Sequence, residues 1–141
     1  MSPRLLTIDI LLPGVPCTYK CIFGMSRPTR GIKRGTNHVV MGKGHSYLFL
    51  TGPGKVYWFL QVRNSHVTYG KEIPRYTEED ERDLAEKHFG DRVNDYDTFE
   101  DVYKNRLISR LTPLHEYQWK RWYFERIMTI GDASHKVSQV R

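Results

Sequence analysis

Hydrophobic residues recur at every second position in much of residues 16–62, the spacing of β-strands that bury one face. Tyr19, Cys21 and Phe23 show this spacing in the first predicted strand. Residues 39–41 and 46–50 flank a Gly-Lys-Gly turn, and a second glycine-rich turn at 51–55 precedes an aromatic run at 56–62. Glycine provides the positive φ angles that tight hairpins require, so two hairpins are predicted. The pattern indicates an antiparallel meander of three to five strands.

Two short helices are predicted after the sheet. Thr77 and Asp80 have the spacing of a capping box, and Leu84 and Phe89 continue an apolar stripe before Gly90. The acidic run over residues 78–86 is interpreted as the solvated face of this helix.

A second helix start is predicted at Thr98 with Asp101, and this helix is expected to continue through residues 106–108. Pro113 is expected to break the next segment. Residues 126–130 are predicted as a buried strand that leads into Gly131 and Asp132.

The 141 residues fit one domain of the α+β fold class, spanning residues 1–141. The sheet is assigned to residues 16–62, the helical segment to 77–110, and the strand leading into the Gly-Asp pair to 117–136. Residues 5–12 are predicted as a strand or buried segment, because Asp9 interrupts the apolar run that a signal peptide would need. No run of about 18 apolar residues encodes a membrane span, and an intracellular protein is expected.

Charge and metal-binding residues limit the classes of function. The net charge of +6 suggests nucleic-acid binding, but the basic residues are scattered and no nucleic-acid-binding signature accompanies them. Cys17 and Cys21 are expected to be buried free thiols. No metal site is expected, because the histidines lack any metal-binding spacing; they are His38, His45, His66, His88, His115 and His135.

The end of the chain carries the most specific motif. It reads Trp122-Tyr123-x-x-Arg126-Ile127-x-x-Ile130-Gly131-Asp132-Ala133-x-His135-Lys136. This segment resembles the Gly-Asp motif of FAD-dependent monooxygenases of the aromatic-hydroxylase type. The resemblance implies that Gly131 allows a close approach to the cofactor and that the Asp132 carboxylate accepts hydrogen bonds from ribityl hydroxyls of FAD.

The resemblance extends upstream and covers roughly residues 16–138. Residues 19–26 are similar to the first strand of the substrate-side sheet in the fungal members of that family, which make indole-diterpenes and meroterpenoids. Residues 54–59 resemble the aromatic strand after its second hairpin. Tyr19 is therefore a substrate-side candidate. No catalytic residue is assigned, because Met41 and Gly42 stand where family members often carry a tyrosine before the first hairpin.

The chain also departs from the family pattern. No G-x-G-x-x-G turn for the FAD pyrophosphate is present, since the glycines at 42 and 44 open no helix. Gln139 stands where the family has a proline. The resemblance is thus to a fragment that lacks the N-terminal dinucleotide-binding unit and the C-terminal part.

The family resemblance implies an FAD-dependent monooxygenase of secondary metabolism that uses NAD(P)H as reductant and oxygenates or epoxidises a lipophilic, terpenoid-type substrate. Some relatives carry a membrane anchor. Two alternatives stay open: a truncated chain without activity, and a small protein that binds an apolar ligand. An extracted substrate-side sheet is expected to self-associate through its exposed apolar face.

Overall fold

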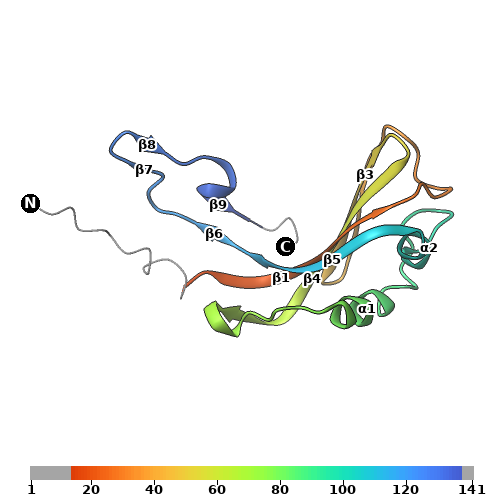
Figure 1. Ribbon diagram of the computed structural model, residues 1–141, viewed down its shortest axis with the longest axis horizontal. Helices are drawn as coiled ribbons and strands as arrows, with labels where there is room; N and C mark the ends of the chain where they lie inside the picture. The colour runs from red at the N-terminus through yellow and green to blue at the C-terminus, as the bar shows by residue number, and fades with distance from the viewer. Residues whose placement is uncertain (1–13, 138–141) are drawn as a thin grey trace, which may run out of the picture.

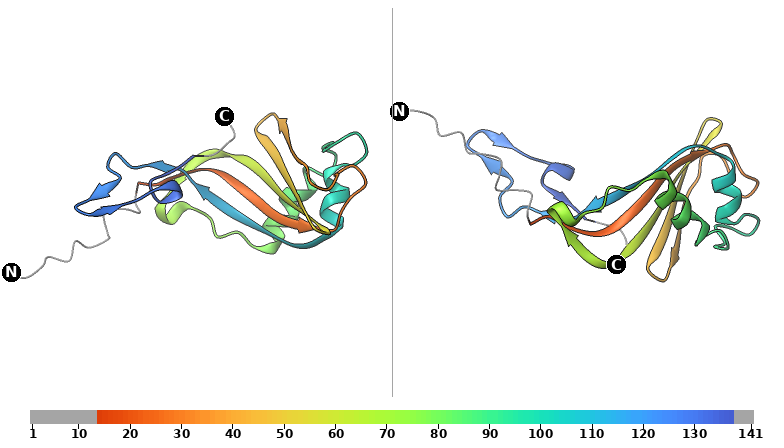
Figure 2. Two further views of the ribbon diagram at one scale, coloured as in Figure 1. Left: turned by 90° about the horizontal axis from the view of Figure 1, so that it is seen from above. Right: turned by 60° about the horizontal axis from the view of Figure 1, so that its bottom comes forward.

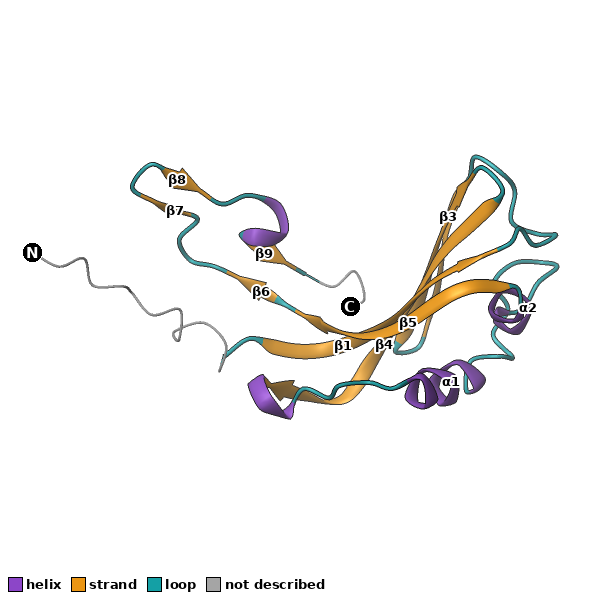
Figure 3. Cartoon of the chain, viewed as in Figure 1, coloured by secondary structure: helices purple, strands orange, loops and turns teal. Residues whose placement is uncertain are grey.

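The protein is described by a computed structural model over residues 14–137, so the segment predicted at 5–12 and the tail with Gln139 lie outside the described residues. A twisted sheet forms the body of the molecule, and two helices cover one of its faces (Figures 1 and 3). A smaller β extension projects from the end opposite the helices. The predicted α+β fold class is confirmed.

The main sheet has five antiparallel strands in the order β2-β3-β4-β1-β5. Their bounds are β1 Pro16–Ser26, β2 Asn37–Gly42, β3 His45–Gly52, β4 Lys55–Tyr69 and β5 Arg106–His115. Strands β2, β3 and β4 form the predicted meander, with Gly44 and Gly54 at positive φ in its two turns. Strand β1 lies between β4 and β5, in the interior of the sheet. This position could not be predicted from the order of the strands in the sequence.

Both predicted helix starts are confirmed. Helix α1, Glu78–Glu86, begins at Thr77, whose backbone N–H donates to Asp80 Oδ2 at 2.7 Å in a reciprocal capping box. Helix α2, Phe99–Lys104, begins with the same arrangement at Thr98 and Asp101. A short 3-10 helix, η2 Gly70–Glu72, follows β4. No helix among the described residues is both long enough and apolar enough to span a membrane.

Two expectations for the segment after α2 were wrong. Residues 106–108 do not continue the helix, because the chain leaves helical geometry at Asn105 and pairs with β1, placing Ile108 opposite Met25. Pro113 lies within β5 and does not break it. Strand β5 is at the edge of the sheet, where a proline without an N–H group is tolerated. Sheet pairing here overrides the local helical pattern.

The hydrophobic core lies between the helices and one face of the sheet. Trp58 is at its centre, with Phe99 and Tyr103 of α2 packed against the indole at ring centroid distances of 5.2 and 6.1 Å. The indole Nε1 donates to Ser26 Oγ at 2.7 Å, and Ser26 Oγ donates to the Val102 carbonyl at 2.8 Å. The core contains Ile22, Ile32, Tyr47, Phe49, Val56, Trp58, Leu60, Leu84, Ala85, Val93, Phe99, Val102, Tyr103 and Leu111.

The opposite face of the sheet, which we call the open face, carries partly exposed apolar side chains. Phe23 and Phe59 meet edge to face at 5.3 Å in its middle. Cross-strand pairing places the other members beside these two rings. The open face comprises Phe23, Val39, Leu48, Leu50, Tyr57, Phe59 and Ile108.

The β extension contains two short ladders, and it lies at the far end of the long axis from α1 and α2 in every view (Figures 1 and 2). Strand β6, Tyr117–Gln118, pairs with β9, His135–Lys136, and β7, Tyr123–Phe124, pairs with β8, Ile127–Met128. The prediction of a buried strand at residues 126–130 was wrong, because Ile127 is 69% exposed and Ile130 is 74% exposed. The only strand that pairs with β8 is β7, and no further layer within residues 14–137 covers these side chains.

Gly24 sits directly over Trp58, and this contact generates a stability prediction. A Cβ atom at position 24 would lie 2.0 Å from Trp58 Cζ2. We expect Gly24→Ala to lower the free energy of unfolding by about 1–3 kcal/mol, the usual cost of overpacking a core. Urea denaturation measures the change. The control is Gly90→Ala, where a Cβ meets no atom within 4 Å, and the idea fails if both variants lose equal stability.

Candidate functional site

The Gly-Asp pair predicted as the flavin contact lies on an exposed turn of the β extension. Gly131 and Asp132 begin the 3-10 helix η3, Gly131–Ala133, and Gly131 has a φ of +60°, a value that favours glycine. Both residues are exposed. Within residues 14–137 the Asp132 carboxylate forms no hydrogen bond or ion pair, so its oxygen atoms are available to an external donor.

Hydrogen bonds around the pair fix the backbone of this turn. The Tyr117 hydroxyl donates to the Asp132 carbonyl at 2.5 Å, and the Ser134 N–H donates to the Gly131 carbonyl at 2.9 Å. Ser134 is fully buried, and its hydroxyl donates to Thr129 Oγ1 at 3.1 Å. The turn therefore holds its backbone in place while it presents a free carboxylate.

The substrate-side candidate Tyr19 lies elsewhere, in β1. It is 6% exposed and pairs with Arg63 of β4 and Leu114 of β5. Tyr19 and Phe23 are four residues apart in a regular part of the strand, so both point to the open face. Among the described residues no hydrogen bond or ring contact joins Tyr19 to Gly131 or Asp132. The structure thus places the two predicted parts of the site on separate elements.

The two cysteines are free and buried, as the sequence predicted. Burial raises the pKa of the Cys21 thiol to about 12, so the reactive thiolate form is strongly disfavoured. Burial also raises the pKa of Cys17. Both residues are packing elements of β1.

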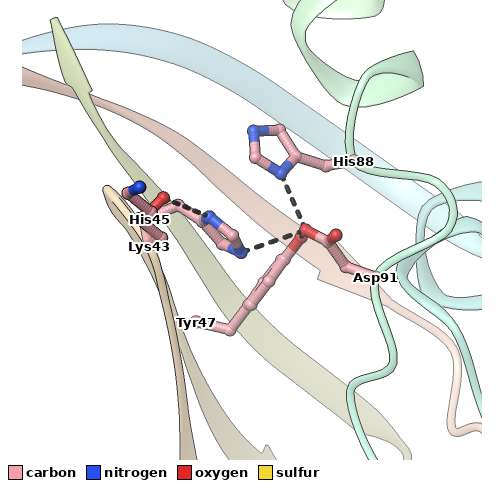
Figure 4. Close-up of polar contacts among 5 residues, drawn as sticks. All are labelled: Lys43, His45, Tyr47, His88 and Asp91. Carbon is pink, nitrogen blue, oxygen red and sulfur yellow. Dashed lines mark hydrogen bonds and ion pairs between the residues drawn. The ribbon is translucent and has the colours of Figure 1, made fainter.

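A polar cluster that sequence analysis did not find lies where the β2–β3 hairpin meets the turn after α1 (Figure 4). It consists of His45, Tyr47, His88 and Asp91. The Tyr47 hydroxyl donates to Asp91 Oδ2 at 2.6 Å. The same oxygen lies 2.7 Å from His88 Nδ1 and 3.2 Å from His45 Nε2. One carboxylate oxygen is thus contacted by three side chains, which come from two separate parts of the chain.

The electrostatics of this polar cluster favour a charged carboxylate beside a neutral phenol. Partial burial tends to raise the pKa of Asp91, but the hydrogen bonds from Tyr47 and His88, together with the two imidazoles, outweigh it and lower the pKa. Burial and the adjacent carboxylate raise the pKa of Tyr47. The only local signals in the sequence are the spacings His45-x-Tyr47 and His88-x-x-Asp91, and neither indicates that the two pairs converge.

Comparison with curated proteins reveals relatives in several fungi. The FAD-dependent monooxygenase BOA8 of Botryotinia fuckeliana is 36% identical over 121 residues, which are 85% of this chain and 16% of that protein. The FAD-dependent monooxygenase asqG of Emericella nidulans is 32% identical over 131 residues, 92% of this chain and 23% of that protein. The FAD-dependent monooxygenase janM of Penicillium janthinellum is 30% identical over 129 residues, 91% of this chain and 27% of that protein.

These similarities confirm the resemblance predicted from the sequence. The chain is related to FAD-dependent monooxygenases and matches one segment of them, since each of these relatives bears that name. It spans about a sixth to a quarter of their length. No family model and no solved structure matches the chain.

The hydrogen bond between Tyr47 and Asp91 generates a second prediction. We expect Tyr47→Phe to lower the free energy of unfolding by about 1–3 kcal/mol, because a hydrogen bond to a charged group is lost in a partly buried site. Thermal or urea unfolding measures this loss. Tyr57→Phe is the matched control on the neighbouring strand, because Tyr57 is 39% exposed on the open face. A loss no larger than that of the control would show that the polar cluster does not stabilise the contact between the β2–β3 hairpin and the turn after α1.

Proposed function

We propose that this chain is the substrate-side portion of an FAD-dependent monooxygenase. In this proposal Asp132 contacts the ribityl chain of FAD and the open face of the sheet covers a lipophilic substrate of the terpenoid type. The observation that carries the proposal is the free Asp132 carboxylate on a glycine turn whose backbone is fixed by hydrogen bonds. The relatives are named FAD-dependent monooxygenases, which supports FAD as the group that this carboxylate binds.

The chemistry of the turn suits a sugar-alcohol chain. An ionised carboxylate is an acceptor only, and ribityl hydroxyls are donors that can bind both of its oxygen atoms. Charge-assisted hydrogen bonds of this kind are stronger than neutral ones. Gly131 has no side chain that would keep a flat ring system away from the backbone. These properties support Gly131 and Asp132 as cofactor-binding residues.

The exposed apolar residues of the β extension support a covered position for it in a longer protein. The cross-strand partners Phe124 and Ile127 are 57% and 69% exposed, and the partners Tyr123 and Met128 are 59% and 72% exposed. Exposed apolar surface of this kind marks an interaction site. We propose that this surface packs against the rest of a flavin-binding unit, which would supply the pyrophosphate contacts.

The proposed division of labour assigns oxygen chemistry to the cofactor and positioning to the protein. When bound, FAD would supply the activation of molecular oxygen with two electrons from NAD(P)H, so that one oxygen atom would go to the substrate and the other would leave as water. The chain's own part is to hold the ribityl end through Asp132 and to exclude water from the substrate with Phe23, Phe59 and their neighbours. Tyr19, which is buried at one end of the open face, would line the innermost part of the space that holds the substrate.

The flavin contact is tested by titrating the chain with FAD and following flavin fluorescence. We expect saturable binding, and we expect Asp132→Ala to weaken it roughly tenfold or more, because one hydrogen bond to a charged group contributes about 1.5–3 kcal/mol. Asp95→Ala, which removes an exposed carboxylate on the loop before α2, should leave the affinity unchanged. Equal affinities for the two variants would contradict the assignment of Asp132.

The open face is tested separately with a fluorescent apolar probe and by sedimentation. We expect Phe23→Ser to weaken probe binding roughly tenfold and to reduce self-association, because burying a phenylalanine side chain contributes about 1.5–3 kcal/mol. Tyr96→Ser, at an aromatic residue that is 67% exposed and outside the sheet, is the control. Probe binding that depends on Phe23 in a chain with no affinity for FAD would favour the alternative of a small apolar-ligand-binding protein.

A further inference from the structure

Three members of the polar cluster, His45, His88 and Asp91, form the donor set of a transition-metal site, and nothing in the proposed flavin function requires this set. One ligand atom of each residue lies within 4.8 Å of the other two. Two imidazole nitrogens with one carboxylate oxygen suit Zn²⁺ and the neighbouring first-row divalent ions, whereas Mg²⁺ and Ca²⁺ prefer oxygen ligands alone.

The orientation of His45 points independently to a cation. Its Nδ1 lies 3.3 Å from the Lys43 carbonyl, which can only accept a hydrogen bond, so the Nδ1 position carries the proton (Figure 4). A neutral imidazole that donates through Nδ1 presents a lone pair at Nε2. That lone pair faces the Asp91 carboxylate at 3.2 Å, so either a second proton on the imidazole or a metal ion lies between the two atoms.

A metal ion fits this position with small movements. Metal–nitrogen and metal–oxygen distances near 2.1 Å place two tetrahedral ligand atoms about 3.4 Å apart. Asp91 Oδ2 lies 3.2 Å from His45 Nε2, which is close to this value, and 2.7 Å from His88 Nδ1, a separation that must widen by roughly 0.7 Å. The ligand atoms of the two histidines lie within 4.8 Å of each other. Side-chain exposures of 20% for His45, 14% for His88 and 31% for Asp91 leave a path for an ion and a water ligand.

The surrounding groups match the usual outer shell of a metal site. The Lys43 carbonyl accepts from the far nitrogen of His45, and the Tyr47 hydroxyl donates to the ligating carboxylate. Such outer-shell hydrogen bonds orient histidine and carboxylate ligands toward the ion. We propose that His45, His88 and Asp91 bind one divalent transition-metal ion of the Zn²⁺ type, which fastens the β2–β3 hairpin to the turn after α1.

The proposal is tested with the full chain after treatment with a chelator. Titration with Co²⁺ should give the visible absorption bands of a four-coordinate complex at one ion per chain, without the near-ultraviolet charge-transfer band of a thiolate ligand. Zn²⁺ should displace the Co²⁺ and raise the melting temperature. A complex with the thiolate band would place the ion at Cys17 or Cys21 and overturn the proposal, as would no stoichiometric complex at all.

Matched variants locate the site. His88→Ala and Asp91→Asn each remove a ligand and should weaken Zn²⁺ binding by more than the roughly 10- to 100-fold that outer-shell changes cause. Asp91→Asn keeps the side-chain size and gives the answer if His88→Ala fails to fold. His66→Ala removes an exposed histidine and should have no effect, whereas Tyr47→Phe keeps all three ligands and should stay within that outer-shell range. Equal affinity of Asp91→Asn and the wild type would overturn the proposal.

Discussion

The contact between Trp58 and the backbone at Gly24 determines the arrangement of the whole molecule. The indole lies under a residue without a side chain, and its N–H group is linked through Ser26 to the carbonyl of Val102 in α2. This links strand β4, strand β1 and helix α2 at one point in the core. A shift of one residue in the pairing of β1 and β4 would turn Trp58 toward solvent, because strand side chains alternate between the two faces. The register, and with it the choice of the covered face, follows from this contact.

Once that face is covered, the other face is left open. Phe23 and Phe59 form an apolar surface without a layer above it among the described residues. The β extension has the same character, since its apolar side chains have only a two-stranded ladder beneath them. Apolar side chains that stay exposed to water do not stabilise the fold. In the proposed function a substrate and further protein structure cover this face, and the relatives are four to six times longer than the chain.

The polar cluster around Asp91 is a second fixed point, of a different physical kind. Trp58 contacts its neighbours mainly by close apolar packing, which does not depend on ions. Asp91 contacts His45 and His88 through charge and hydrogen-bond geometry. The cluster lies at the rim of the core, partly open to solvent. His45, His88 and Asp91 can therefore meet an ion from solution, whereas Tyr47 is buried and packs against Phe99 at 5.2 Å, which connects the cluster to the core around Trp58.

Local signals in the sequence were sufficient for strands β1 to β4, the hairpin turns and both capping boxes. These features depend on side-chain alternation, on glycine at positive φ, and on a side chain that bonds to the backbone three residues away, so all of them act over short distances. The resemblance at Gly131 and Asp132 likewise needed only consecutive residues. Pairing partners are separated in the chain, and only the tertiary structure decided them. The insertion of β1 between β4 and β5, the strand at residues 106–108, the exposure of Ile127, and the meeting of His45 with His88 all depend on what lies alongside a segment, and no local pattern contains that information.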